Sequence, residues 1–336
     1  PKQPYFKGGK SSMKDFVNRG SYYWAQFLCL FRFTQKGKYH FWEKRKCKIA
    51  QWCTLWADKN AYNLVLRDGF GDSFFILSLA HELAKVNHVK LFFLVKPSQV
   101  LLLKMFGFNN NKVLKMLNAK DLMTHTINQA PYPTQGNVFF PQPRYHWQTE
   151  GLMSESKCFV DVFRRLFRLP LKTPLASPCW WPDINNKLSK KIKKAGGIYN
   201  IVLLTPETNL SITANLMWWK KLAESLQNRG YFVVCNVCKG ANKIAGTADW
   251  NLSVEELLAL GARCRAVVSI RSGLCDLFAR KRKNLFVLDA PFHSATEKKF
   301  FNLNFNFNIK EVNEYSDEKQ IPIETLVDKI ANIKNL

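Results

Sequence analysis

The sequence reads LRDGFGDS over residues 66–73 and SIRSGLCD over residues 269–276, and these two stretches decide the fold. Each follows a short apolar run and precedes an amphipathic one. This pattern predicts a strand, a tight glycine loop and a helix N-terminus, where backbone N–H groups collect anions. Two such loops predict a two-domain α/β protein whose ligand lies in the cleft between the halves, at the carboxyl ends of both sheets.

Length and composition fit two globular domains. The chain has 336 residues, of which 47% are hydrophobic. No apolar run approaches the roughly 20 residues of a membrane span. The nearest such run, residues 22–33, is interrupted by Gln26 and Arg32. No cleavable signal is visible, although a start at Pro1 leaves room for a longer native N-terminus. We therefore expect a cytoplasmic protein.

The nine cysteines predict reduced, buried thiols. Their number is odd and most of them lie in apolar segments, as in cytoplasmic proteins. Cys235 and Cys238 form a lone C-x-x-C pair, but Cys235 belongs to the strand-like run 231–235. A zinc site would need a second pair or His partners at suitable spacing. We expect core packing here, with no metal and no cofactor.

Positive charge dominates the sequence, with 50 Lys and Arg against 25 Asp and Glu and a net charge of +25. Residues 1–60 are especially basic and carry interleaved aromatic rings. This mixture suits an anionic membrane surface, where each Lys or Arg contributes about 1 kcal/mol. An equally weighted alternative is a solvated basic face whose rings pack on the next domain. Nucleic acid comes third, because no recognised binding motif accompanies the charge.

Hydrophobic periodicity divides the rest of the chain into two α/β units joined by a proline-rich linker. The first unit, residues 61–175, is expected to contain strands at 63–66 and 89–95 and helices at 73–85, 98–106 and 153–167. The second unit, residues 183–310, is expected to contain strands at 199–204, 231–235, 266–270 and 284–288 and helices at 184–194, 214–228, 252–260 and 273–279. We expect a connector at 300–307 and a terminal helix within residues 320–336.

Three segments together resemble one enzyme family, the ADP-heptose-type heptosyltransferases. GFGDSFFILSLAHELAK (residues 69–85) resembles the family's opening loop and helix. IVLLTPETNLSITANLMWWKKLAESLQNRGYFVVC (201–235) and LSVEELLALGARCRAVVSIRSGLCDLFA (252–279) resemble its second domain. The resemblance covers residues 62–290 in order. It implies a GT-B fold, in which two Rossmann-like doubly wound domains face each other across a cleft, with the acceptor on the first and the nucleotide sugar on the second.

The chain departs from that family at both loops of the second domain. Where the family commonly has a basic residue after the first strand, this chain has Thr208 and Asn209. Arg271 replaces the acidic residue before the Ser-Gly pair, and Asp276 replaces the usual His after it. A guanidinium can bind a diphosphate with two donors, so Arg271 could take over that contact. These departures predict that the donor is not bound in the family's standard way.

The first loop is expected to hold the catalytic base. An inverting transfer needs a general base near the acceptor hydroxyl, and positive charge or N–H dipoles for the departing nucleotide diphosphate. Asp72 is the expected base, and Gly69 and Gly71 complete the loop. The alternative is that Asp72 caps the helix at 73–85, which is the more frequent role of an Asp at such a position. Asp68 is the reserve candidate for the base, or else a turn residue.

The second loop is expected to hold the donor. Arg271, Ser272 and Gly273 would bind the diphosphate, with Gly273 allowing the backbone to approach closely. The alternative is a structural Arg271 paired with Asp276, and a glycine that only the turn requires. Asp276 is otherwise a local cap or a ribose contact. Further donor contacts are expected after the strand at 199–204, at Thr205, Glu207 and Asn209.

The resemblance implies a glycosyltransferase of lipopolysaccharide or capsule synthesis, peripheral on the inner face of the cell membrane. Its partners would be a nucleotide-sugar donor, a glycan or glycolipid acceptor and an anionic membrane surface. No Asp-x-Asp occurs, which favours metal-independent catalysis. Two rival functions stay open: a non-catalytic GT-B-like assembly protein, and a basic nucleic-acid-binding protein, which would leave the paired loops unexplained. A dinucleotide-dependent oxidoreductase is disfavoured because G-x-G-x-x-G is missing.

Overall fold

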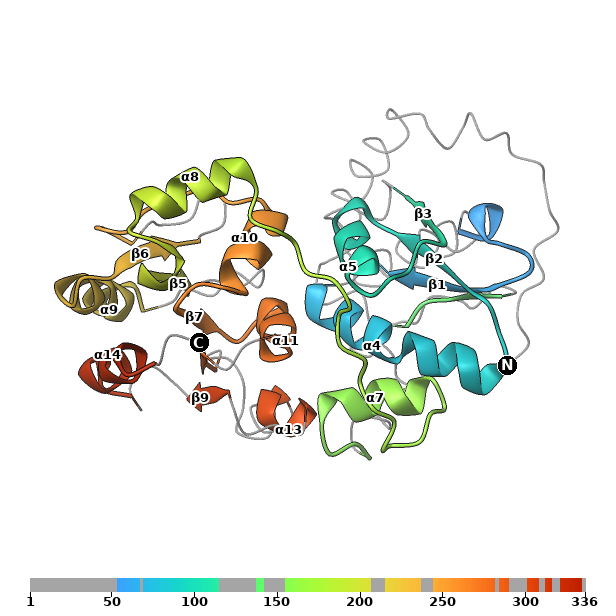
Figure 1. The fold of residues 1–336 in the computed structure, drawn as a ribbon. Helices are drawn as coiled ribbons and strands as arrows, with labels where there is room; N and C mark the ends of the chain where they lie inside the picture. The colour runs from blue at the N-terminus through green and yellow to red at the C-terminus, as the bar shows by residue number, and fades with distance from the viewer. Residues whose placement is uncertain are drawn as a thin grey trace, which may run out of the picture.

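The chain folds into two α/β halves, which Figure 1 shows side by side. This computed structural model describes residues 53–66, 69–114, 137–141, 155–206, 215–236, 244–281, 284–289, 301–307, 312–315 and 321–333. All but the last few residues of the basic aromatic region 1–60 lie outside these ranges, so its proposed membrane role stays a prediction. Within the described ranges, no helix is both long and apolar enough to cross a membrane.

The first half is built on a parallel sheet. Its strands are β1 (Tyr62–Leu66), β2 (Leu91–Val95), β3 (Asn111–Val113) and β4 (Val138–Phe139), in the order β3-β2-β1-β4. Its described helices are α4 (Phe70–Asn87), the 3-10 turn η1 (Pro97–Gln99), α5 (Val100–Met105) and α7 (Phe159–Leu166). Strand β1 lies inside this sheet and ends at Leu66, and α4 begins shortly after it at Phe70.

The second half has a larger parallel sheet. Its strands are β5 (Ile201–Thr205), β6 (Phe232–Cys235), β7 (Ala266–Ile270), β8 (Leu285–Leu288) and β9 (Asn313–Tyr315), in the order β6-β5-β7-β8-β9. Its described helices are α8 (Asn186–Lys194), η4 (Ile198–Asn200), α9 (Leu216–Asn228), α10 (Val254–Gly261), α11 (Gly273–Ala279), α13 (Leu303–Phe307) and α14 (Ile323–Ala331). The strand order reverses at β5, which is the switch point of a doubly wound sheet.

Both faces of the second sheet are buried, and β5 shows why its sequence is continuously apolar. Val202 and Leu204 belong to a core cluster with residues of α9 and α14. Ile201 and Leu203, on the opposite face, belong to a cluster with residues of α10 and α11. Alternate residues of a strand point to opposite faces, so a strand covered by helices on both sides needs apolar side chains throughout.

Aromatic rings join the two halves into one core. The ring of Phe307 in α13 packs on Phe74 and Phe75 of α4, with ring centroids 5.7 and 5.6 Å apart. Phe301 packs on Phe159 of α7 at 4.9 Å. Figure 1 shows the same arrangement, with α11 beside α4 and α13 beside α7. Large buried rings dominate such contacts, so this interface resembles a domain core.

The expected α/β class with parallel sheets is confirmed, but several local expectations are wrong. Helix α7 begins at Phe159 rather than at residue 153, and the short strands β3 and β4 had no counterpart among the expected strands. Helix α4 begins at Phe70 rather than at residue 73, because Gly69 is extended (φ −64°, ψ 172°) and serves as its N-cap. Residues 303–307 form a helix rather than a connector. Strand β9 had no counterpart in the expected elements, since three half-buried residues show no readable alternation.

Candidate functional site

The two glycine loops meet where the halves touch. Helix α4 follows β1, and α11 follows β7, so both helices begin at the carboxyl ends of their sheets. A Cβ atom placed on Gly71 would lie 3.1 Å from the Cα of Gly273, and one placed on Gly273 would clash with the backbone nitrogen of Gly71. The two backbones are therefore in direct contact, and only glycine fits at either position.

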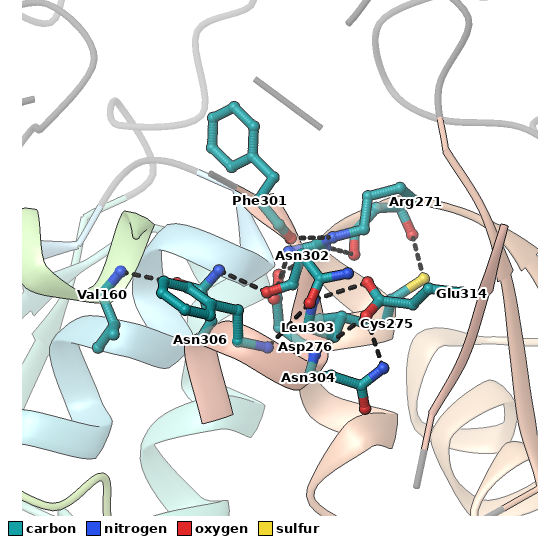
Figure 2. A network of polar contacts seen from close by, with 12 residues as sticks. Val160, Arg271, Cys275, Asp276, Phe301, Asn302, Leu303, Asn304, Asn306 and Glu314 are labelled. Atoms are coloured by element: carbon teal, nitrogen blue, oxygen red, sulfur yellow. Dashed lines mark hydrogen bonds and ion pairs between the residues drawn. The ribbon is translucent and has the colours of Figure 1, made fainter. Parts of the chain in front are cut away.

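Arg271 and Asp276 form a buried ion pair at the start of α11 (Figure 2). Arg271 Nη2 donates to Asp276 Oδ1 over 2.7 Å, and Nη1 donates to Oδ2 over 3.1 Å. Arg271 also donates from Nε to the carbonyl of Phe301 and from Nη1 to that of Ser272, at 3.1 and 2.8 Å. The two side chains are only 6% and 4% exposed. The guanidinium is thus held by four hydrogen bonds inside the protein.

This geometry decides between the two interpretations of Arg271. From the sequence, the guanidinium was expected against a donor diphosphate in a cleft, with the pairing to Asp276 as the alternative. The structure shows the paired alternative, and the expectation that Arg271 faces an open cleft is wrong. The cause is local, because the first turn of α11 brings Asp276 back over the end of β7, within reach of both Nη atoms.

Two neighbouring carboxylates affect this ion pair. Burial raises the pKa of Asp276, and the charges of Asp72 and Glu314 add to that effect while Arg271 opposes it. Burial is the largest single effect on Arg271 and would lower its pKa, but Asp276, Cys275 and Glu314 together outweigh it and the pKa of Arg271 is raised. The pKa of Glu314 is raised by burial as well, although its amide partners and Arg271 oppose the shift. Asp276 therefore has one guanidinium and two carboxylates as charged neighbours.

Glu314 is a site residue that the sequence analysis missed. Its Oε1 accepts the backbone N–H of Leu303 at 2.6 Å, and its Oε2 accepts that of Asn304 at 3.0 Å. In α13, Asn306 Oδ1 accepts the N–H of Val160 in α7 at 2.8 Å (Figure 2). The network thus runs from β9 through α13 into the first half. Its sequence signal was weak, since one acidic residue in a three-residue strand predicts nothing by itself.

Asp72 is the third residue of α4 and is not its N-cap. Its side chain is half-buried, and it lies close enough to Asp276 for their charges to interact. The capping role considered as its alternative belongs to Gly69. Asp72 is therefore a partly accessible carboxylate at the junction of the halves, in a position where it could accept a proton from a bound hydroxyl.

Thr205 ends β5 at the switch point of the second sheet. It is 3% exposed and pairs in register with Ser269 of β7. Its hydroxyl has no hydrogen-bond partner among the described residues. Buried hydroxyls are normally hydrogen-bonded, so an unsatisfied one at this edge calls for an explanation.

The structure brings together most of the expected site residues that it describes. Those at the junction of the halves are Gly69, Gly71, Asp72, Arg271, Ser272, Gly273 and Asp276. Thr205 lies on the strand next to β7, while Asp68, Glu207 and Asn209 lie outside the described residues. Within the described ranges, no group of three or more His, Cys, Asp or Glu side chains is arranged to hold a metal ion.

Solved structures with the same fold include two glycosyltransferases. The structure of E. coli ADP-heptose lps heptosyltransferase II is 14% identical, with a TM-score of 0.51, over 80% of this chain and 97% of that one. A family 9 glycosyl transferase from Veillonella parvula DSM 2008 is 12% identical, with a TM-score of 0.50, over 83% and 93%. No family model and no curated protein matches the sequence. At these identities the likeness confirms the GT-B fold that the resemblance implied.

Proposed function

We propose that the chain is a glycosyltransferase that moves a sugar from a nucleotide-sugar donor to a glycan or glycolipid acceptor. The observation that carries this proposal is the buried hydroxyl of Thr205 at the switch point of the second sheet, which has no hydrogen-bond partner among the described residues. Ligands of doubly wound sheets bind at that point, beyond the carboxyl ends of the strands. A donor phosphate or ribose oxygen would satisfy the hydroxyl there.

The donor contacts are proposed from side chains at the carboxyl ends of β5 and β7. Because Arg271 is committed to Asp276, the diphosphate would be held by hydroxyls, from Thr205 and from Ser272, rather than by the guanidinium. Glu207 and Asn209 extend this set in the segment after β5. The donor diphosphate would then be bound by neutral hydroxyl groups, and not by the two N–H donors of an arginine side chain.

Asp72 is proposed as the general base of an inverting, metal-independent transfer. Its half-buried carboxylate lies at the junction of the halves, where acceptor and donor would meet. A base in this place removes the proton of the attacking hydroxyl as the new glycosidic bond forms, and the nucleotide diphosphate leaves with the electron pair of the broken bond.

The acceptor and location are proposed from composition. The basic, aromatic residues 1–60 would hold the enzyme on the anionic inner face of the cell membrane, where lipopolysaccharide or capsule precursors are accessible. A non-catalytic GT-B-like protein is the second candidate, and the internal pairing of Arg271 and Asp276 favours it. That protein would bind a nucleotide without transferring its sugar.

Calorimetry with nucleoside diphosphates and their sugars tests the donor site. Thr205→Val should weaken binding of the preferred nucleotide about tenfold or more, since a hydrogen bond to a charged group is worth roughly 1.5–3 kcal/mol, whereas Thr205→Ser should retain it. Ser78→Ala is the matched control, because Ser78 carries another buried, unsatisfied hydroxyl, in α4. Equal affinities for all four proteins would remove Thr205 from the site, and no nucleotide binding at all would overturn the proposed function.

A further inference from the structure

The carboxylate of Asp276 crosses the junction and lies against the first turn of α4. A Cβ atom placed on Gly71 would be 2.6 Å from Asp276 Oδ2, so this oxygen occupies the space that any other side chain at position 71 would fill. The adjacent residue in the chain is Asp72. A side chain of the second half therefore touches the turn that carries the proposed base of the first.

The position of Asp276 is fixed on several sides. Arg271 donates hydrogen bonds to both carboxylate oxygens of Asp276 and to the carbonyls of Ser272 and Phe301. Phe301 packs in turn on α7 of the first half. The carboxylate therefore cannot turn away from Gly71 without breaking a buried, two-pronged ion pair.

We propose that Asp276 is a positioning residue for Asp72, and that Arg271 acts through Asp276 by holding its carboxylate against Gly71. The proposal deepens the proposed function, because it gives the base a partner in the opposite half. Asp276 fixes where the first turn of α4 lies relative to the donor half, and it presents a negative charge to Asp72.

Two of the departures from the heptosyltransferase pattern form one ion pair. Arg271 and Asp276 occupy the two positions at which the second loop differs from that pattern, and they are each other's partners. The two residues depend on each other, since an Arg buried without Asp276 would leave an uncompensated charge.

The chemical consequence is electrostatic, because the Asp72 carboxylate and the Asp276 carboxylate of the opposite half interact as like charges. Like charges near each other favour the protonated form of each, and a general base works best when its proton affinity is matched to the operating pH. The groups that face Asp276 are Arg271, Cys275, Asp72 and Glu314. Removal of the Asp276 charge should therefore make Asp72 easier to ionise.

The test is a carboxyl titration by NMR on the full chain labelled with ¹³C-aspartate, in which Asp72→Asn assigns the Asp72 signal. In Asp276→Asn the titration midpoint of Asp72 should fall by about 0.5–1 pH unit relative to wild type. The double variant Arg271→Met/Asp276→Leu should show the same direction. This double variant keeps the proposal testable if Asp276→Asn does not fold, because replacing a buried ion pair by apolar residues of similar volume often leaves the stability of a protein unchanged.

Asp161→Asn is the control, since Asp161 is a buried acid paired with Arg164 in α7 and should leave Asp72 unchanged. A midpoint of Asp72 that stays at the wild-type value in the folded variants would overturn the proposal. The titration needs no substrate, so a chain that transfers no sugar would count against the proposed function alone. Where transfer is measured, the acidic limb of the pH–rate profile should move with the midpoint.

Discussion

Gly71 and Gly273 touch backbone to backbone, so the proposed acceptor and donor halves meet directly at these two glycines. Each is the residue that lets a helix N-terminus approach its counterpart, and neither has a positive φ that would require glycine for conformational reasons. This contact therefore depends on the absence of a side chain at both positions, and not on the conformational freedom of glycine.

Gly273→Ala should accordingly destabilise the protein. The added methyl group would meet the backbone of Gly71, which cannot move aside as a flexible side chain can. We expect a loss of about 1–3 kcal/mol in the free energy of unfolding, as for an overpacked core, measured by chemical denaturation. Gly69→Ala serves as control, because its nearest neighbour would be Asp72 Oδ2 at 3.9 Å, and it should cost less than about 1 kcal/mol. Equal losses in both variants would show that the contact is not tight.

Arg271→Ala should also cost stability rather than only ligand affinity. It would leave the Asp276 carboxylate buried without its partner, which typically costs about 3–5 kcal/mol. Arg229→Ala is the matched control, since Arg229 and Asp328 are 2.7 Å apart but about half exposed. That exposed pair should contribute less than about 1 kcal/mol. A variant at Arg271 as stable as the one at Arg229 would mean that the buried pair is not formed in solution.

Much of the fold could be predicted because its elements are regular. Strand β7 and helix α11 were expected over the residues that they occupy, since an apolar run followed by Ser-Gly is a strong local signal. Asp72 and Gly273 were singled out from the sequence, and the structure brings their two loops together. Their roles stay predictions until they are tested.

The ion pair between Arg271 and Asp276 could not be predicted as firmly as the regular helices and strands. Sequence spacing left the guanidinium equally able to face a ligand or its own helix, and only burial of the loop against Phe301 decides between them. Glu314 lies 38 residues beyond Asp276 and reaches the network through strand pairing with β8. Such long-range contacts carry no local signal in one sequence.

Two cysteines should differ sharply in reactivity. Burial raises the pKa of the Cys158 thiol to about 11, so only about a thousandth would be thiolate at pH 8. Cys179 is exposed. Iodoacetamide at pH 8, followed by peptide mass mapping, should label Cys179 at least about tenfold faster than Cys158. In denaturant the two rates should converge, and a native Cys158 that reacts as fast as Cys179 would contradict its burial.

Asp72→Asn separates catalysis from binding and from stability. If Asp72 is the general base, turnover should fall by about 10² to 10⁴, while donor affinity stays near wild type because the nucleotide lies on the other half. The fold should survive, since Gly69 rather than Asp72 caps α4, and the loss of one first-turn acid costs a helix about 0.3–1 kcal/mol. Removal of the like charge beside Asp276 offsets part of even that cost.

Transfer rate, donor affinity and melting temperature therefore need to be measured on the same variant. Asp161→Asn supplies a control in which another buried acid of the same half, paired with Arg164, is neutralised. Wild-type turnover in Asp72→Asn would reject Asp72 as the base and shift the search to Asp68 or Glu207.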